Sequence, residues 1–306
     1  MNPSLLVLLC YISWGLLSIY WSLFSNIDPT LVLCFRITWS LVFCFILLLI
    51  KGQLKDIKDI FKDKRQMFFL LLSSITVTIN WGMYIFAISV GKLLDASLAY
   101  YMHPIFSIVL GYFVYKERLT KLQWVAFYLA LVGVSIPIFA YGVFPYFAII
   151  IGTSFAVYGA LKKQVKASGV LSIFMETLLI SPLAFLYLFL NLKNSTISSM
   201  QWALLPTTGI VTSLPLILFA IGIKNTSLSL AGILMYINPT IQLFIAIFFY
   251  NETFTRIHAF MFFFVLLSVC LFLFDSLKNM NKENLNKKDK PRLFSSLSYL
   301  NCFYFT

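Results

Sequence analysis

The chain alternates long apolar runs with short polar connections. A helix needs about 20 apolar residues to cross the hydrocarbon core of a bilayer. Ten runs reach that length, at residues 4–23, 31–50, 68–89, 94–114, 122–140, 143–161, 169–190, 204–222, 226–249 and 257–275. The pattern therefore predicts an all-α membrane protein with ten transmembrane helices.

The second half of the chain repeats part of the first. When residues 96–134 are shifted by 135 positions, ten of the 39 positions match without a gap. The matches include residue types that chance rarely aligns in apolar sequence, namely Pro104/Pro239, Glu117/Glu252, Thr120/Thr255, Tyr101/Tyr236 and Tyr115/Tyr250. The shift carries the fourth run onto the ninth, and a displacement by an odd number of runs turns the second copy upside down in the membrane.

This inversion predicts a 5+5 repeat, an arrangement that many secondary transporters use. The first five-helix repeat is expected over residues 1–140 and the second, inverted one over 141–275, followed by a cytoplasmic tail at 276–306. Inverted repeats offer two near-equivalent packings, one open to each side of the membrane. A duplicated helix bundle without transport activity is the alternative.

Composition and charge agree with a membrane protein. Charged residues make up 11% of the 306 residues and hydrophobic residues 60%, whereas soluble proteins are about 25% charged. The net charge of +12 comes from basic residues that flank the apolar runs, which favours membrane orientation over nucleic-acid binding. With the N-terminus in the cytoplasm, the inner connections and the tail hold 19 Lys and Arg residues and the outer connections three. Both termini are therefore expected inside.

Two polar segments receive separate predictions. Residues 51–66 alternate Lys and Asp with spaced apolar positions, which favours a short helix on the cytoplasmic surface. Residues 276–290 are rich in Lys and Asn and are expected to be disordered. The five cysteines show no metal-binding spacing, and no cofactor is indicated.

Proline marks the middle of two matched runs. Pro104 and Pro239 each remove a backbone hydrogen bond and crowd the carbonyl four residues earlier, which belongs to Tyr100 or Met235. In hydrocarbon a freed carbonyl must find a partner or line a cavity. Paired breaks of this kind predict a solute site near the bilayer midplane. Proline kinks that serve only packing are the alternative.

Matched side chains surround the two prolines. Tyr101 and Tyr236 either line the solute path or pack between helices. His103 and Asn238 hold equivalent positions, about 160° around the helix from the tyrosines. The two pairs would face one cavity only if the helix were unwound. His103 is a candidate for proton coupling, and the alternative is a hydrogen-bonded packing residue.

Arg36 and Glu176 are charged residues well inside apolar runs. Each costs about 2.5–3.5 kcal/mol at a helix centre and so needs a partner or water. Their depths differ by about 12 Å along the membrane normal, so a direct salt bridge requires tilt and long reach. Otherwise Arg36 snorkels outward. We assign Glu176 to the cavity in preference to a structural role, and expect Glu117 and Glu252, at run ends, to cap helices or pair locally.

A polar and aromatic face in the third run completes the candidate path. Asn80, Trp81 and Tyr84 follow one another at helical spacing, and hydrogen bonding between helices is the alternative role. Weaker candidates are Trp14, Trp21 and Tyr158. The sequence has no phosphate-binding GxxxxGK[ST], no HExxH and no G-x-S-x-G motif, so machinery for an ATP-driven pump or a hydrolytic enzyme is not indicated.

Several longer motifs resemble a known family. In order they are SWG at 13–15, FRITWS at 35–40, INWGMYIFA at 79–87, DASLAYYMHPIFSIVLGYFVYKERL at 95–119, SFAVYGALKK at 154–163, METLLISPLAF at 175–185, GIVTSLPLILFA at 209–220 and MYINPTIQLFIAIFFYNE at 235–252. Over residues 4–275 the chain resembles the RarD branch of the drug/metabolite transporter superfamily, which is built from two EamA-type halves. The resemblance implies ten helices, a bacterial inner-membrane location and transport without ATP. His103 departs from it, because such proteins carry Asn before this proline.

These observations predict a secondary transporter of a small organic metabolite or drug-like solute that works by alternating access. A membrane-embedded lipid-handling protein or a scaffold without transport activity is the alternative. The expected partners are the solute and the lipid bilayer. A coupling proton and a counter-substrate both stay open, and the sequence indicates no oligomeric state.

Overall fold

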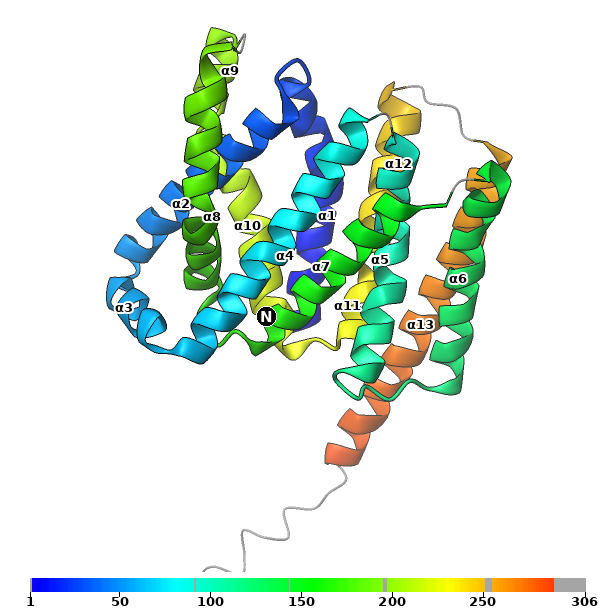
Figure 1. Cartoon of the computed structure of the whole chain (residues 1–306). Coiled ribbons are helices and arrows are strands. Elements are labelled where there is room, and N and C mark those ends of the chain that lie inside the picture. The colour runs from blue at the N-terminus through cyan, green and yellow to red at the C-terminus, as the bar shows by residue number, and fades with distance from the viewer. Residues whose placement is uncertain (1, 91, 143, 195–196, 251–254, 289–306) are drawn as a thin grey trace, which may run out of the picture.

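The computed structural model describes residues 2–90, 92–142, 144–194, 197–250 and 255–288, and this part of the chain is helical without strands. The helices are α1 (Pro3–Trp21), α2 (Pro29–Ile50), α3 (Leu54–Lys62), α4 (Lys64–Ser89), α5 (Leu93–Phe113), α6 (Lys121–Tyr141), α7 (Tyr146–Gln164), α8 (Gly169–Asn191), α9 (Ser199–Leu204), α10 (Thr207–Gly222), α11 (Leu228–Leu234), α12 (Ile237–Tyr250) and α13 (Arg256–Lys288). All but α3 and α9 run lengthwise through one bundle (Figure 1).

Each of the ten predicted runs coincides with one helix or with two consecutive helices. By length and composition, eight helical segments of the described residues could cross a membrane, and Leu98–Phe113 is a shorter apolar helix. The helix α7 is not among the eight and carries Lys162 and Lys163 in its last turn. The all-α prediction is therefore confirmed, and the full set of ten spans stays a prediction.

Side chains fix where several helices begin. Asp28 caps α2 by accepting a hydrogen bond from the Leu31 amide at 2.9 Å, just before a proline at the first helical position. Thr120 and Gln123 form a capping box at the start of α6. Thr255 precedes α13 and accepts from the His258 amide at 3.3 Å. The matched residues Thr120 and Thr255 thus both cap the N-terminus of a helix.

The two matched prolines differ in their effect on the helix. Helix α5 continues through Pro104, so the predicted break is absent there. In the second half the helix is interrupted between Leu234 and Ile237, and Pro239 lies in the first turn of α12, where its missing N–H costs little. The Met235 carbonyl accepts a hydrogen bond from the Asn238 amide at 3.0 Å, so it is not left unpaired.

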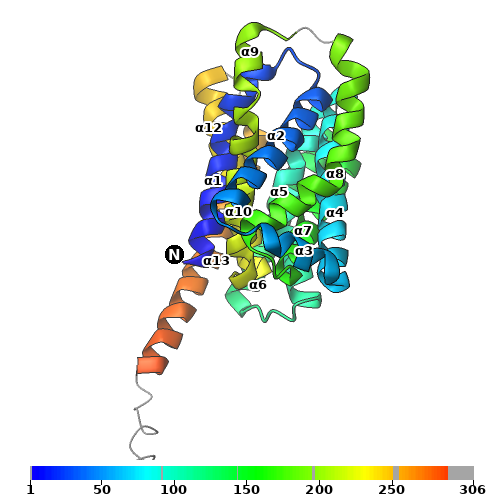
Figure 2. The same cartoon turned by 90° about the vertical axis from the view of Figure 1, so that its left-hand side faces the viewer.

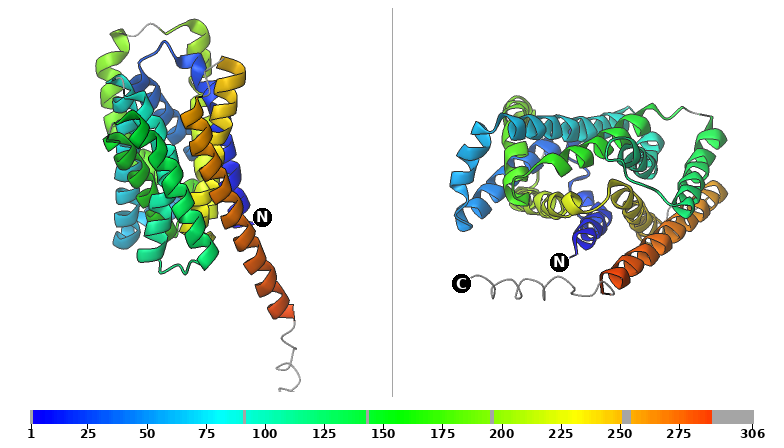
Figure 3. Two further views of the ribbon diagram at one scale, coloured as in Figure 1. Left: turned by 90° about the vertical axis from the view of Figure 1, so that its right-hand side faces the viewer. Right: turned by 90° about the horizontal axis from the view of Figure 1, so that it is seen from below.

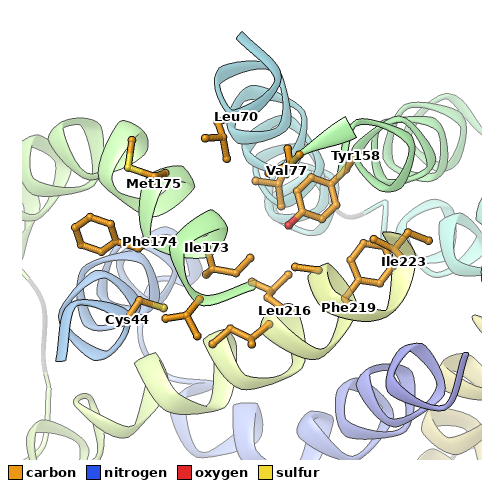
Figure 4. Close-up of a cluster of buried hydrophobic side chains, with 14 of the residues drawn as sticks. Cys44, Leu70, Val77, Tyr158, Ile173, Phe174, Met175, Leu216, Phe219 and Ile223 are labelled. Atoms are coloured by element: carbon orange, nitrogen blue, oxygen red, sulfur yellow. The ribbon is translucent and has the colours of Figure 1, made fainter. Parts of the chain in front are cut away.

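Helices of both halves share one interior. Helix α1 packs on α10 and α12, α2 on α8 and α10, α4 on α7 and α8, and α5 on α7 and α11. Cys44, Leu70, Tyr158, Ile173 and Phe219 belong to one buried cluster that joins five of these helices (Figure 4). Helices α6 and α13 pack against each other and stand to one side of the rest (Figures 1 and 3).

Most of the basic connections lie at one end of the bundle. The start of α1, the surface helix α3 and the distal part of α13 lie at the lower end in Figure 1, with the α5–α6 and α7–α8 connections (Figures 1 and 2). The prediction of a short helix within 51–66 is confirmed by α3. We call this the basic end, and the end that carries the α1–α2 connection and α9 the opposite end.

The prediction of disorder over 276–290 is wrong up to Lys288, because α13 continues to that residue. Asp275 accepts hydrogen bonds from Thr120 at 2.7 Å and from Asn279 at 3.0 Å. The Thr120 bond ties α13 to the start of α6 at the end of the predicted span, and Gln123 Nε2 donates to Ser276 Oγ at 3.3 Å just beyond it. Residues 289–306 lie outside the described part.

Glu117 links the two halves at the basic end. Its carboxylate accepts hydrogen bonds from the Leu228 amide at 2.5 Å, the Ser229 amide at 2.9 Å and the Ser229 hydroxyl at 2.6 Å. These are the first residues of α11, whose orphan N–H groups need acceptors. The capping role predicted for Glu117 is confirmed, and Glu252 lies outside the described residues.

Candidate functional site

A cavity of about 400 Å³ lies between helices of the two halves. This volume falls within the range of small-molecule sites. Phe24 and Ser25, from the connection between α1 and α2, line one end of the cavity together with Pro29, the first residue of α2, and Phe155, Leu216 and Met235 line it deeper in the bundle. The cavity therefore extends inward from the opposite end.

Six of the predicted site residues line this cavity, and they are Arg36, Asn80, Trp81, Tyr84, His103 and Asn238. Five do not line it, and they are Tyr101, Pro104, Glu176, Tyr236 and Pro239. The cavity also includes the weaker candidates Trp14 and Trp21, and residues that sequence reasoning missed, among them Tyr100, Thr212 and Gln242.

Arg36 is the charged residue of the cavity lining within the described part of the chain. Its Nε donates a hydrogen bond to Thr212 Oγ1 at 3.1 Å. Its guanidinium carbon lies 4.4 Å from the ring centroid of Trp21 and 5.2 Å from that of Trp81. Indole faces attract a cation, so the two rings hold the guanidinium at the cavity without neutralising it.

Asn80 and Tyr84 extend this wall along α4. The Asn80 amide donates to the Ile151 carbonyl at 2.7 Å and to Ser154 Oγ at 3.2 Å, so it also joins α4 to α7. The rings of Tyr84 and Tyr100 meet edge to face with centroids 5.8 Å apart. This face of α4 therefore has both of the roles considered for it. It lines the cavity, and Asn80 forms hydrogen bonds between helices.

His103 and Asn238 approach the cavity from the two halves. His103 Nε2 lies 3.1 Å from Ser107 Oγ, and the imidazole lies 5.0 Å from the Phe155 ring. Its Nδ1 is buried and has no hydrogen-bond partner among the described residues. Asn238 Oδ1 accepts from Gln242 Nε2 at 2.8 Å. His103 and Asn238 thus line one cavity while Tyr101 and Tyr236 do not, in keeping with the prediction that the two pairs face different sides of the helix.

Tyr101 and Tyr236 pack where α5 crosses the second half. Both are buried, their ring centroids are 6.4 Å apart, and Tyr236 Oη donates to the Tyr101 carbonyl at 3.2 Å. A Cβ atom on Gly232 would lie 3.1 Å from the Pro104 carbonyl oxygen, so α11 approaches α5 closely beside them. Of the two roles considered for the tyrosines, the structure supports packing.

Glu176 belongs to a separate buried polar cluster nearer the basic end. Its Oε1 accepts from Lys162 Nζ at 2.8 Å and from Ser73 Oγ at 2.7 Å, and its Oε2 accepts from Tyr158 Oη at 3.1 Å. Lys162 also donates to Ser172 Oγ at 2.5 Å. We call these five residues the buried ion-pair cluster. It joins α4 of the first half to α7 and α8 of the second.

The sequence prediction missed Lys162 because this residue was assigned to a cytoplasmic connection. Its side chain is 0% exposed and that of Glu176 5% exposed. A usable signal was present, since α7 and α8 are joined by a short connection that turns them antiparallel. Lys162 lies at the end of one helix and Glu176 two turns into the next, within reach of a four-carbon side chain.

Comparisons with known proteins support the assignment of this chain to a family of membrane transporters. The sequence matches the EamA-like transporter family over residues 1–139 and again over residues 144–274. It is 39% identical over 275 residues to "Uncharacterized transporter YojE" of Bacillus subtilis strain 168, covering 88% of this chain and 92% of that protein. It is 31% identical over 278 residues to "Protein RarD" of Escherichia coli strain K12, covering 89% and 94%.

A solved crystal structure resembles the fold, with a TM-score of 0.71 at 16% identity, covering 88% of this chain and 96% of the other. At that identity the likeness concerns the fold alone. The family matches together span nearly the whole described chain. The protein is thus a multi-pass membrane protein that belongs to the EamA-like transporter family and is of the RarD type.

Proposed function

We propose that this protein is a secondary transporter of a small organic solute, built as an inverted repeat of five plus five membrane helices. The observation that carries the proposal is the cavity, which lies between the two halves, extends inward from one end of the bundle and has no lining residue from the connections at the other. Alternating access needs a central site that is open to one side at a time.

The pattern of helix neighbours supports the inverted repeat. A shift by five spans pairs α1 with α7, α2 with α8, α4 with α10, α5 with α11 and α12, and α6 with α13. Exchanging the members of each pair turns the α5–α7 contact into the contact of α12 with α1, and the α4–α7 contact into that of α10 with α1. It also turns α2–α10 into α8–α4 and leaves the pairs α2–α8 and α6–α13 unchanged. Such pairing is expected when two similar units are related by a pseudo-two-fold axis in the membrane plane.

The basic end is the cytoplasmic end in this proposal, which places both termini inside, as the Lys and Arg count predicts. The cavity then opens outward. Its inner side is closed by polar contacts between the halves. One of these contacts is the Glu117 cap on α11. The others include the hydrogen bond that Tyr115 Oη donates to the Ala160 carbonyl at 2.6 Å, and the buried ion-pair cluster. Opening inward requires such contacts to separate while the outer ends of the helices close.

The bacterial relatives support an inner-membrane location, and the cavity favours transport over the lipid-handling and scaffold alternatives. A scaffold has no need for a cavity with a cation and hydrogen-bonding groups in its wall. A coupling proton and a counter-substrate both stay compatible with the proposal.

Flux measurements test the proposal directly. Proteoliposomes loaded with a mixed metabolite extract are expected to lose one class of compound faster than protein-free vesicles, as measured by mass spectrometry of the medium. A variant that lacks residues 289–306 serves as control for the scaffold alternative and is expected to keep the flux. Correctly folded protein that moves no compound class, with extracts from several organisms, would contradict transport.

A further inference from the structure

We infer that the cavity binds an organic anion that carries one carboxylate or similar group on a planar apolar body, with Arg36 as its counter-charge. This inference rests on the proposed transport function and specifies its substrate class.

The first observation is the missing counter-charge of Arg36. The described side chains form two ion pairs, Lys62–Asp59 and Lys162–Glu176, and Arg36 belongs to neither. Its hydrogen bond to a described side chain goes to the neutral Thr212 hydroxyl. A guanidinium offers five donors in a plane and binds carboxylates through two parallel hydrogen bonds. One donor is used on Thr212, and the rest are suited to an anion in the cavity.

The second observation is the charge of the remaining lining. Within the described residues no Asp or Glu lines the cavity. Glu176, an acidic residue well inside an apolar run, has its carboxylate bound to Lys162, Ser73 and Tyr158. An ammonium group in this cavity would meet no counter-charge and would be repelled by Arg36. The cavity therefore discriminates against organic cations and, more weakly, against zwitterions.

The third observation is the shape and polarity of the walls. The rings of Trp21 and Trp81 both lie close to the guanidinium, and Trp14, Tyr84 and Phe155 continue an aromatic lining. Aromatic walls favour flat apolar groups through stacking and area burial. Deeper in the cavity, the buried Nδ1 of His103 lacks a partner and is suited to a hydrogen bond with a polar substituent of the solute.

A matched series of three compounds tests the inference. Phenylacetate, phenylacetamide and phenethylamine share one aromatic body and carry an anion, a neutral amide and a cation. We expect purified protein in lipid nanodiscs to bind phenylacetate about 10- to 100-fold more tightly than phenylacetamide, because each of the two hydrogen bonds from Arg36 to a carboxylate is about twice as strong as a bond to a neutral amide. Phenethylamine should bind more weakly than both. Quenching of tryptophan fluorescence reports binding.

Variants locate the preference. Arg36→Gln should abolish the difference between acid and amide, and Arg36→Lys should keep part of it, because the charge remains but the two-pronged geometry is lost. Arg65→Gln is the matched control. Arg65 also lies over an aromatic ring, that of Phe69 at 5.9 Å, but outside the cavity, so its loss should leave the preference unchanged. If Arg36→Gln does not fold, the three compounds measured on the wild type and on Arg36→Lys still test the inference.

Equal binding of acid and amide, the same preference in Arg36→Gln, or no binding of the three compounds at millimolar concentration would overturn the inference. The outcome is separable from that of the proposed function. Proteoliposomes that move a neutral or cationic solute selectively would leave transport standing and refute the anion assignment. Tight binding of phenylacetate without flux of any carboxylate would support the anion assignment and contradict transport.

Discussion

Replacing Glu176 by Leu is expected to lower the free energy of unfolding by about 3–5 kcal/mol, the usual cost of leaving a buried charge without its partner. The charge left behind belongs to Lys162, which is 0% exposed. The second change Lys162→Met should restore most of the loss, because two apolar side chains of similar volume often replace a buried ion pair without cost. Denaturant unfolding in mixed micelles measures both effects.

An exposed ion pair supplies the control for this comparison. Lys62 and Asp59 lie 3.8 Å apart on α3 with side chains 80% and 75% exposed, and removing either should change stability by less than about 1 kcal/mol. A doubly substituted protein as unstable as Glu176→Leu would show that the cluster stabilises the fold through its hydrogen bonds to Ser73 and Tyr158, and not through charge pairing.

Transport provides a second measure of the same cluster. Glu176→Gln keeps the shape of the side chain but leaves Lys162 unpaired, at contacts that our proposal requires to separate and re-form in each cycle. We expect the variant to insert into the membrane and to lose flux or coupling. Normal flux at any pH would refute a role of Glu176 in transport.

Gly209→Ala is expected to destabilise the protein by about 1–3 kcal/mol or more, the range of an overpacked interior. A Cβ atom at this position would lie 2.3 Å from the carbonyl carbon and oxygen of Trp39 and 2.8 Å from the Ser40 amide nitrogen. These are backbone atoms of α2, which have no rotamer to change. Helices α2 and α10 would therefore have to move apart.

The same displacement should weaken solute binding. Arg36 lies one turn before Ser40 on α2, and Thr212 lies three residues after Gly209 on α10, so separation of the helices lengthens the Arg36–Thr212 hydrogen bond. Gly82→Ala in α4 is the matched control, because its Cβ would meet nothing within 4 Å, and it should leave stability equal or slightly higher. Equal stability of the two variants would contradict the close approach of α2 and α10.

Sequence patterns predicted the parts of this protein that depend on one helix at a time. The apolar runs marked every long helix, and the helical phase placed His103 and Asn238 on the face away from the tyrosines. Matching of the halves singled out Glu117 and Thr120, which cap helices. These features depend on helix length, helical periodicity and capping, and all three can be read from residues that are close together in the sequence.

Features that depend on how helices meet were not predictable in this way. Glu176 was assigned to the cavity, but its carboxylate faces Lys162 and the hydroxyls of Ser73 and Tyr158. Which face of α8 turns toward α7 is decided by packing, and the sequence pattern is apolar on all sides. Likewise, Pro104 stays within a continuous α5 while Pro239 lies in the first turn of α12, and the sequence around the two prolines does not show this difference.

The uncompensated guanidinium has an electrical consequence. If Arg36 lies within the membrane field and the cavity opens alternately to each side, the empty carrier moves a positive charge that the anion-loaded carrier does not. One elementary charge is worth about 2.3 kcal/mol per 100 mV of membrane potential. Net flux should then depend on voltage, whereas one-for-one exchange of anions should not. Proteoliposomes clamped with a potassium gradient and valinomycin would separate the two, and voltage-independent net flux would contradict this assignment of charge.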